Sequence, residues 1–142
     1  DERAMRRRAG FEQRLAELGV QGVPVCEVPA PSSLANGRAG FAELRARHPG
    51  IDVVFCGSDV IAHGVITEAQ ASGLAVPRDV AVMGFGDLPF AAFTHPMLST
   101  VRIDGTSIGR QAARFILDRV ESRDVGPRVR DLGFSIVTRA SA

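Results

Sequence analysis

The chain has 142 residues, of which 45% are hydrophobic and 23% are charged, close to the composition of an average globular protein. This length suits a single domain with its own buried core, and the composition excludes a disordered tail, a collagen-like repeat and a coiled coil. The formal net charge of +1 is too balanced to indicate a nucleic acid or a membrane surface as partner.

Cysteine usage and the shortness of the apolar runs bear on the compartment. Cys26 and Cys56 each lie in an apolar run, and two cysteines do not make a disulfide framework, so free buried thiols in a reducing compartment are expected. No apolar core of a signal peptide follows the arginine-rich start, and no apolar run approaches the roughly 18 residues of a membrane-spanning helix. We therefore expect a cytoplasmic protein without a membrane segment, or an excised fragment whose targeting signal is lost.

The first half of the chain alternates patterns typical of helices and strands. Phe11, Leu15 and Leu18 recur at the helical spacing i, i+4, i+7, and Gly19 ends that pattern. The near-continuous apolar run over 51–56 is typical of a parallel strand covered on both faces. In chain order, we predict a helix over 2–18, a strand over 23–28, a loop over 29–36, a helix over 37–47 and a strand over 51–56.

The second half continues this alternation. Ser58 or Asp59 is a good amino-terminal cap for the next helix, and Gly73 ends that helix. The predicted elements are a helix over 60–72, a strand over 80–85, an extended segment over 98–103, a helix over 106–122 and a last strand over 132–138. Helices and strands that alternate over short connections predict an α/β protein in which helices cover a mainly parallel sheet, giving three α/β/α layers.

Polar and glycine residues gather where the predicted strands end. They occur in four segments, 30–33, 57–59, 86–87 and 99–100. In open parallel sheets, ligands bind outside the carboxyl ends of the strands. These segments therefore predict a ligand site at that edge of the sheet, and the alternative is that they serve only as helix caps and turns.

Signatures of catalysis, of cofactors and of metals are missing from the sequence. No Walker loop occurs, and Gly84-Phe85-Gly86 lacks the third glycine of a dinucleotide-binding fingerprint. His63 lies four residues after Asp59 on one predicted helix, but no nucleophile or metal-ligand spacing accompanies this pair. We expect no catalytic residue, no cofactor and no metal site. The alternative is an enzyme that uses Asp59 and Asp87.

Four stretches match one bacterial protein family in their order and spacing. They are Arg7-Arg8-Ala9-Gly10-Phe11, the segment over 52–64, the segment over 73–85 and His95-Pro96-Met97-Leu98-Ser99-Thr100-Val101. Together they resemble the effector-binding domain of LacI/GalR-family transcription regulators over nearly the whole chain. The stretch over 84–101 is most similar to the gluconate-repressor branch of that family.

The resemblance implies a periplasmic-binding-protein-like fold of two α/β subdomains, an effector in the cleft, a homodimer and an amino-terminal helix-turn-helix. Only the carboxyl-terminal subdomain is matched, so operator DNA is expected to bind only through a missing amino-terminal domain. Residues 1–103 and 128–142 resemble that subdomain, and 104–127 holds a crossover helix that normally belongs to the other one. We expect this subdomain or a second chain to cover the apolar face of helix 106–122.

Six ligand-binding candidates follow from the family's motifs, namely Arg7, Ser32, Ser58, Asp59, Gly86 and Asp87. Ser32 stands where an aromatic residue often stacks on the ligand, Ser58 where the family usually has Asn, and Gly86 where it usually has Asp. These departures argue against simple sugar recognition and leave room for an acidic effector, such as a sugar acid or phosphosugar, held by the guanidinium of Arg7. The alternative for Arg7 is a surface salt bridge.

The helix predicted over 60–72 corresponds to the family's subunit-contact helix. Its interface candidates are Val60, Ile61, Gly64, Val65 and Glu68. The helix is apolar on more than one face, so one stripe can cover the sheet while another meets a second chain. The alternative is that its apolar residues only cover the sheet.

We therefore predict the non-enzymatic, effector-sensing and dimerising part of a LacI-type regulator, whose effector is a sugar or a sugar acid. The alternative is the sugar-binding component of a transport system, which shares the fold and requires an export signal. The codons upstream of Asp1 distinguish the two, since a helix-turn-helix supports the regulator and an apolar leader supports the transporter.

Overall fold

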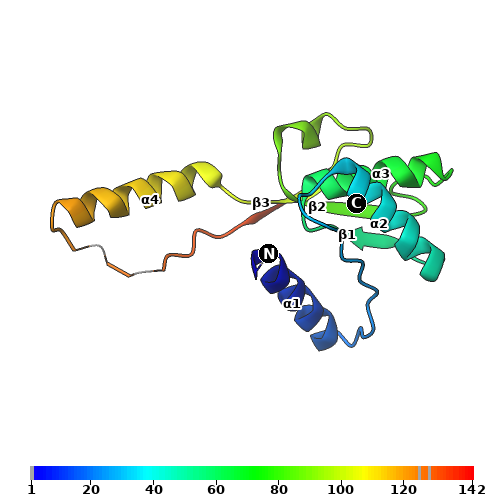
Figure 1. Ribbon diagram of the computed structural model, residues 1–142, viewed down its shortest axis with the longest axis horizontal. Coiled ribbons are helices and arrows are strands. Elements are labelled where there is room, and N and C mark those ends of the chain that lie inside the picture. The colour runs from blue at the N-terminus through cyan, green and yellow to red at the C-terminus, as the bar shows by residue number, and fades with distance from the viewer. Residues whose placement is uncertain (1, 125, 128) are drawn as a thin grey trace.

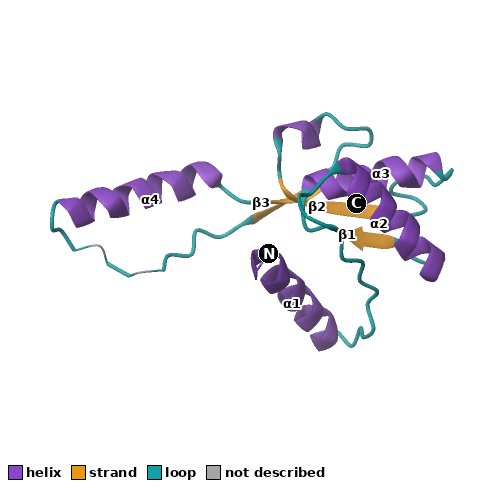
Figure 2. Ribbon diagram, viewed as in Figure 1, coloured by secondary structure: helices purple, strands orange, loops and turns teal. Residues whose placement is uncertain are grey.

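The computed structural model describes residues 2–124, 126–127 and 129–142 (Figures 1 and 2). Its elements in chain order are α1 (Glu2–Glu17), α2 (Leu34–Arg47), β1 (Val53–Phe55), α3 (Asp59–Ala71), β2 (Ala81–Gly86), the 3-10 helix η1 (Pro89–Ala92), β3 (Ser99–Arg102), α4 (Gly105–Val120) and β4 (Ser135–Val137). All of the helices predicted from the sequence are present, with ends within three residues of the predicted ones. The short helix η1 was not predicted.

One sheet contains the strands in the order β1-β2-β3-β4. β1 and β2 are parallel, as are β2 and β3, whereas β4 runs antiparallel to β3. β4 is antiparallel because the chain leaves the sheet along β3, passes through α4 and returns along the neighbouring position (Figure 1). The predicted α/β class with a mainly parallel sheet is therefore confirmed.

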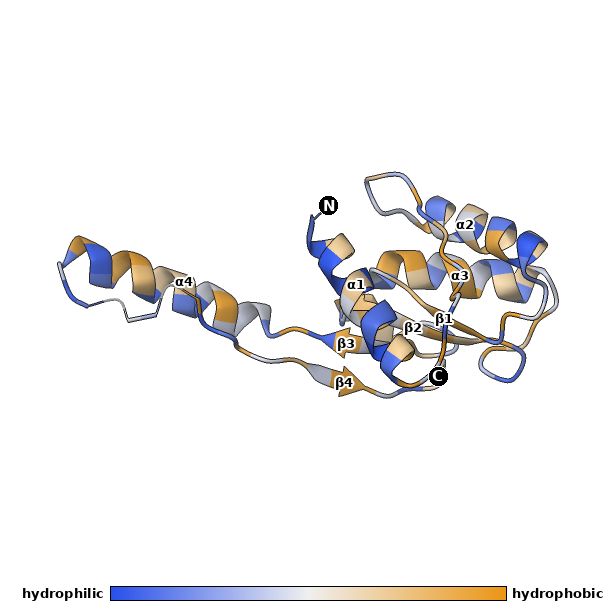
Figure 3. Cartoon of the chain, turned by 90° about the horizontal axis from the view of Figure 1, so that it is seen from below, coloured by the Kyte–Doolittle hydropathy of each residue, from blue (hydrophilic) through white to orange (hydrophobic). Residues whose placement is uncertain are grey.

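Helices cover both faces of the sheet. α2 and α3 lie on one face and α1 lies on the other (Figure 3). Successive side chains of a strand point to opposite faces. In β1, Val54 therefore packs toward the core under α3, and Phe55 points to α1, whose Phe11 ring lies 5.1 Å from the Phe55 ring. The structure confirms the predicted three layers.

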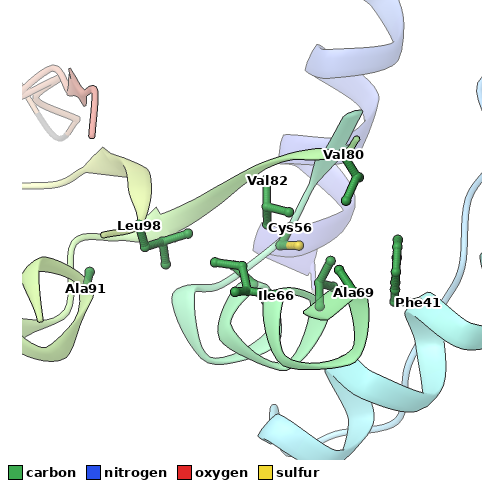
Figure 4. Packing of buried hydrophobic residues seen from close by; sticks show 10 residues of the cluster. Phe41, Cys56, Ile66, Ala69, Val80, Val82, Ala91 and Leu98 are labelled. Atoms are coloured by element: carbon green, nitrogen blue, oxygen red, sulfur yellow. The ribbon is translucent and has the colours of Figure 1, made fainter. Parts of the chain in front are cut away.

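The hydrophobic core lies between the sheet and α3 (Figure 4). Its buried members come from α2, from α3 and from the strands and loops beside them: Phe41, Cys56, Ala62, Val65, Ile66, Ala69, Val80, Val82, Ala91 and Leu98. α1 contributes no buried residue. The two helix layers are therefore unequal, and the apolar burial that stabilises the fold is concentrated on the α3 side.

The strand predicted over 23–28 is wrong, because this backbone pairs with no strand of the sheet. The segment is held by its side chains instead. A Cβ added to Gly40 of α2 would lie 2.7 Å from a methyl of Val28 and 3.5 Å from the sulfur of Cys26. Pro24 also lacks the N–H that a sheet position requires. β1 is consequently left as an edge strand.

α4 projects away from the sheet (Figure 1), and none of its described residues is buried. Its exposed apolar side chains are Ile108, Ile116, Leu117 and Val120. Of the two covers expected for the apolar face of α4, this subdomain is therefore wrong, and a second chain stays a prediction.

The end of the chain lies between β2 and β3 and joins them. Ser141 is fully buried, and its Oγ donates to the carbonyl oxygen of Val82 at 2.6 Å and accepts from the N–H of Ser99 at 2.8 Å. The N–H of Val82 in turn donates to the carbonyl oxygen of Ser141 at 2.7 Å. These bonds satisfy backbone groups at the start of both strands that would otherwise be buried without partners.

Candidate functional site

The carboxyl ends of β1, β2 and β3 meet at one edge of the sheet. Segments 57–59 and 86–87, which the sequence singled out, lie at that edge. The prediction that 99–100 ends a strand is wrong, because Ser99 and Thr100 begin β3, and Thr100 is joined to the start of α3 through the carboxylate of Asp59. One Asp59 oxygen accepts from the hydroxyl of Thr100 at 2.5 Å, and the other accepts from the N–H of Leu88 at 2.6 Å. One side chain thus fastens the start of α3 to β3 and to the loop after β2.

Asp59 is fully buried, and both of its carboxylate oxygens accept hydrogen bonds from the protein. The glycines of β2 make room for it. A Cβ on Gly84 would collide with Asp59 Oδ1, and one on Gly86 would lie 3.6 Å from Oδ2. The packing of Asp59 therefore explains the two glycines of the Gly84-Phe85-Gly86 motif, and Asp59 stabilises the edge of the sheet from a buried position.

Asp87 also accepts hydrogen bonds from the protein on both of its oxygens. Its Oδ2 accepts from Nε of Arg102 at 2.6 Å, and its Oδ1 accepts from a terminal nitrogen of Arg139 at 2.7 Å. Burial by itself raises the pKa of Asp87, but the hydrogen bonds from Arg139 and Arg102 outweigh that effect and lower the pKa. The two guanidinium groups thus use about half of the acceptor positions of this carboxylate, and its side chain is only 11% exposed.

Arg7 of α1 carries the remaining charge at this edge. Its guanidinium carbon lies 4.2 Å from the centre of the Phe85 ring, and a terminal nitrogen donates to the carbonyl oxygen of Gly57 at 3.3 Å. Its Nε is buried without a hydrogen-bond partner. Burial lowers the pKa of Arg7, and the nearby charge of Arg3 lowers it further.

The salt-bridge alternative for Arg7 is not what the structure shows. Glu2 pairs with Arg6 at 2.5 Å, and Asp59 is committed to Thr100 and to a backbone N–H. Within the part of the chain that the structure describes, Arg7 forms no ion pair. Its guanidinium therefore remains a cation with spare donors beside an aromatic ring.

The two serine candidates differ in their surroundings. Ser58 caps α3, and its Oγ accepts from the N–H of Ile61 at 3.3 Å, which leaves its own O–H free to donate. Ser32 is exposed in the loop before α2, and among the described residues it makes no hydrogen bond to the other candidates. The structure thus places Ser58 at the sheet edge with Arg7 but does not join Ser32 to them.

The residues predicted for a subunit interface are mostly used inside the chain. Val65 belongs to the core. Gly64 faces α2 so closely that a Cβ there would collide with the carbonyl oxygen of Leu34, and Glu68 pairs with Arg38 of α2 at 2.8 Å. Gly64 and Val65 are buried within this chain, between α3, α2 and the sheet. The close approach of Gly64 on α3 to Gly37 on α2 was missed by the sequence interpretation.

The outer face of α3 carries other side chains. The His63 ring lies 5.7 Å from the ring of Phe90 in η1, and the side chain of Gln70 donates to the carbonyl oxygen of His95 at 3.0 Å. Val60 is half-buried at the start of the helix. Phe93, just after η1, is 87% exposed. Phe93 thus leaves an exposed aromatic ring near η1, whose Phe90 contacts this face.

Two arginines at the site, Arg102 and Arg139, were not predicted. Arg102 ends the strand that carries Thr100, so its place at the edge was open to inference from the sequence. Arg139 follows β4 and reaches Asp87 across 52 positions of the chain, and no local pattern marks such a partner.

Other site types find no support among the described residues. No group of three or more His, Cys, Asp or Glu residues is placed to hold a metal ion, and no helix is both long and apolar enough to cross a bilayer. Both cysteines are free, and burial raises the pKa of the Cys56 thiol to about 12. Two shallow hollows of about 340 and 420 Å³ lie beside α4, away from the sheet edge.

Comparison with known proteins places the whole chain in one family. The periplasmic binding protein-like domain matches residues 1–142. The HTH-type transcriptional regulator GntR of Pseudomonas aeruginosa is 38% identical over 143 residues, covering 99% of this chain and 41% of that protein.

Solved structures agree with this assignment. The transcription regulator GntR from Chromobacterium violaceum has a TM-score of 0.93 and 34% identity, covering 99% of this chain and 52% of that one. A LacI family transcriptional regulator from Arthrobacter sp. FB24, in complex with lactose, has a TM-score of 0.78 and 28% identity, covering 91% of this chain and 47% of that one. The chain thus spans about half the length of the relatives that it matches.

Proposed function

Because the chain belongs to the periplasmic binding protein-like family, as the effector-binding domain of LacI-type regulators, we propose that it senses a small-molecule effector without acting as an enzyme. Its relatives are transcription regulators, which favours this function over a transport component. As in a bacterial regulator, it would act in the cytoplasm. Effector binding would shift subdomain closure and, through it, the spacing of DNA-binding heads outside this chain.

The chain would contribute one wall of the effector cleft. In this proposal, residues 1–103 and 128–142 form the carboxyl-terminal subdomain, and 104–127 belongs with the opposite subdomain; the boundary residue 128 lies outside the described residues. The exposed apolar face of α4 supports the division, because such a face is typical of an element that packs elsewhere. The opposite wall would come from residues that this chain does not contain.

The charge at the sheet edge favours an anionic effector, a sugar acid or a phosphorylated sugar. Arg7 carries this part of the proposal, since its cation has no carboxylate partner among the described residues. Asp59 and Asp87, which would otherwise grip sugar hydroxyls, are occupied by protein donors. A guanidinium fork with spare donors suits a carboxylate or a phosphate.

A chimera would test this proposal with both walls of the cleft present. This chain would replace the matching part of the Chromobacterium violaceum regulator, and calorimetry would measure binding of a six-carbon aldonate and of the corresponding neutral hexose. We expect the aldonate to bind and the hexose to bind far more weakly. Arg7→Gln should abolish aldonate binding, because the charged donor is lost. Arg6→Gln, on the exposed side of the same helix, is the matched control and should bind as before.

Equal binding of hexose and aldonate would contradict the anionic effector while leaving an effector function intact. Aldonate binding that survives Arg7→Gln unchanged would instead show that the site is placed wrongly. Thermal unfolding of each chimera shows that a loss of binding is not a loss of folding.

A homodimer is the second part of the proposal. The free face of α3 and the neighbouring Phe93 support it, because an aromatic ring so exposed is typical of an interaction surface. Val60, Ile61 and Glu68 then contribute only where α2 leaves them accessible. Sedimentation equilibrium of the 142-residue chain should show a dimer that Phe93→Ser converts to monomer. A wild-type chain that stays monomeric at all concentrations would exclude this surface.

A further inference from the structure

The part of the chain that includes α4 is attached to the sheet through two strands. β3 leads out to α4 and β4 leads back, and the two pair antiparallel, with Thr100 opposite Val137 and Arg102 opposite Ser135. Figure 1 shows this pair of strands running from the sheet toward α4. We call β3 and β4 together the exit ribbon. Its direction decides where α4 lies relative to the sheet.

One carboxylate contacts both strands of the exit ribbon at its root. Asp87 accepts from Arg102 at the outgoing end of β3 and from Arg139 just after β4. The side chains of Asp87 and Arg139 are only 11% and 14% exposed, whereas that of Arg102 is 50% exposed. Shielding from water makes the Arg139 contact the stronger of the two, since exposed ion pairs contribute little.

Arg139 in turn is bound to the chain at the start of β3. Its second terminal nitrogen donates to the carbonyl oxygen of Leu98 at 2.7 Å, and its backbone N–H donates to the hydroxyl of Ser99 at 2.8 Å. The returning chain is thus bound to the outgoing chain on one side and to Asp87 on the other. Together these contacts form a closed set around the root of the ribbon.

The backbone at Asp87 directs its carboxylate to this place. Asp87 has φ of +52° and follows Gly86 with φ of +128°, so the chain turns sharply as β2 ends. A non-glycine residue in the left-handed region is uncommon, and Asp tolerates it better than most because of its short polar side chain. Local strain of this kind persists where the surrounding contacts favour it.

From these contacts we infer that Asp87 is a positioning residue, which clamps both strands of the exit ribbon and so sets the direction in which α4 leaves the sheet. The clamp is separate from ligand contact, since both Asp87 oxygens face arginines of the ribbon. If the proposed function holds, any effector-driven change in subdomain closure would have to work against this clamp. The clamp itself requires no effector and can be tested without one.

The test measures the distance between α4 and the sheet body in the 142-residue chain. Spin labels would be attached at Ala71→Cys on α3 and Ala113→Cys on α4, two exposed positions, in a Cys26→Ser background that leaves only the buried Cys56. Pulsed electron resonance then gives the distribution of label separations. The unaltered clamp should give a narrow distribution.

Asp87→Asn is the decisive variant, because Asn also tolerates the left-handed backbone and keeps the size of the side chain while losing its charge. We expect a broader distribution with a shifted mean. Arg102→Gln should broaden it less, since the better-shielded Arg139 contact remains. The double variant should be no broader than Asp87→Asn alone, because both changes remove one shared contact. Glu43→Gln, which breaks an exposed ion pair with Arg47, is the matched control.

Amide hydrogen exchange separates a lost clamp from a melted sheet. The proposal requires that the amide of Val101 in β3 stays protected in Asp87→Asn while the label distribution broadens. An unchanged distribution in Asp87→Asn overturns the clamp. Broadening that occurs only when Val101 loses its protection also overturns it, since the effect would then be unfolding of β3.

Discussion

The two helices α3 and α4 are similar in length but lie in opposite environments, since α3 packs against the sheet and α4 is exposed. α3 has thirteen residues, six of them buried, and uses separate faces for the sheet and for α2. α4 has sixteen residues, of which the structure buries none, although its sequence has a clear apolar face. Amphipathic periodicity therefore indicates that a helix has an apolar face to bury, but it does not show that the same chain supplies the surface that covers this face. In this protein α3 finds its partners within the chain and α4 does not.

The largest expected contrast comes from one substitution made in both helices. Ile66→Ala removes a fully buried side chain from the core and should lower the free energy of unfolding by about 2–5 kcal/mol, because a cavity is left. Ile116→Ala on α4 removes a side chain that is 65% exposed and should change it by no more than about 0.5 kcal/mol. Urea unfolding followed by circular dichroism measures both. Comparable losses would mean that α4 is packed in solution and that the contrast is false.

The second contrast uses glycines. Gly64→Ala should destabilise the chain, toward the upper end of roughly 1–3 kcal/mol, because the added Cβ meets the backbone of α2 and neither helix can move without disturbing the core. Gly109→Ala on α4 has open space around it and should be neutral or stabilising by up to about 1 kcal/mol, through better helix propensity. Thermal unfolding compares the two. A tolerated Gly64→Ala would contradict the close contact between α2 and α3.

The same contrast shows what the sequence could predict. Helical spacing located all four helices, and the apolar run over 51–56 located β1, because both signals are local. The prediction of a strand over 23–28 was wrong because an extended, apolar segment also needs a neighbouring strand for its backbone. Its proline lacks an N–H, and the segment packs on α2 and not in the sheet. Local pattern therefore predicted the elements and the mainly parallel sheet, but not every pairing.

Residues of the candidate site were predicted unevenly for a related reason. Motif order pointed to Arg7 and to the segments at the strand ends, and the structure brings most of these together. Motif order could not show that Asp59 bonds to Thr100 or that Asp87 pairs with Arg139, because those contacts span 41 and 52 positions of the chain. The facing glycines Gly37 and Gly64 were visible in the sequence, yet only the crossing of two helices gives them their role.

The third contrast concerns the end of the chain. Ser141→Ala removes the hydroxyl that links β2 to β3 and leaves the N–H of Ser99 and the carbonyl oxygen of Val82 buried without it. We expect a loss of about 1–3 kcal/mol in unfolding free energy. Ser135→Ala in β4 is exposed and should have almost no effect. Equal stability of both variants would show that Ser141 does not link β2 to β3 in solution.

The smallest expected effect is a pH dependence at Asp87, where the sheet body meets the exit ribbon. Because its pKa is lowered in the folded chain, Asp87 stabilises the fold fully above the pKa of an unfolded Asp, about 3.9, and this contribution is lost as the pH falls through the lower folded value. Asp87→Asn carries no such titration.

The difference in melting temperature between wild type and Asp87→Asn should therefore be constant near neutral pH and shrink as the pH falls below about 4. Glu43→Gln, which breaks an exposed ion pair, is the control variant for the same measurement. In wild type, the distribution of distances between the labels on α3 and α4 should broaden over the same acid range. Protonation of the Asp87 carboxylate would then release the exit ribbon while the core beneath α3 stays folded. If the difference in melting temperature does not change with pH, the carboxylate of Asp87 is not held by its arginines in solution, and the exit ribbon must take its direction from strand pairing alone.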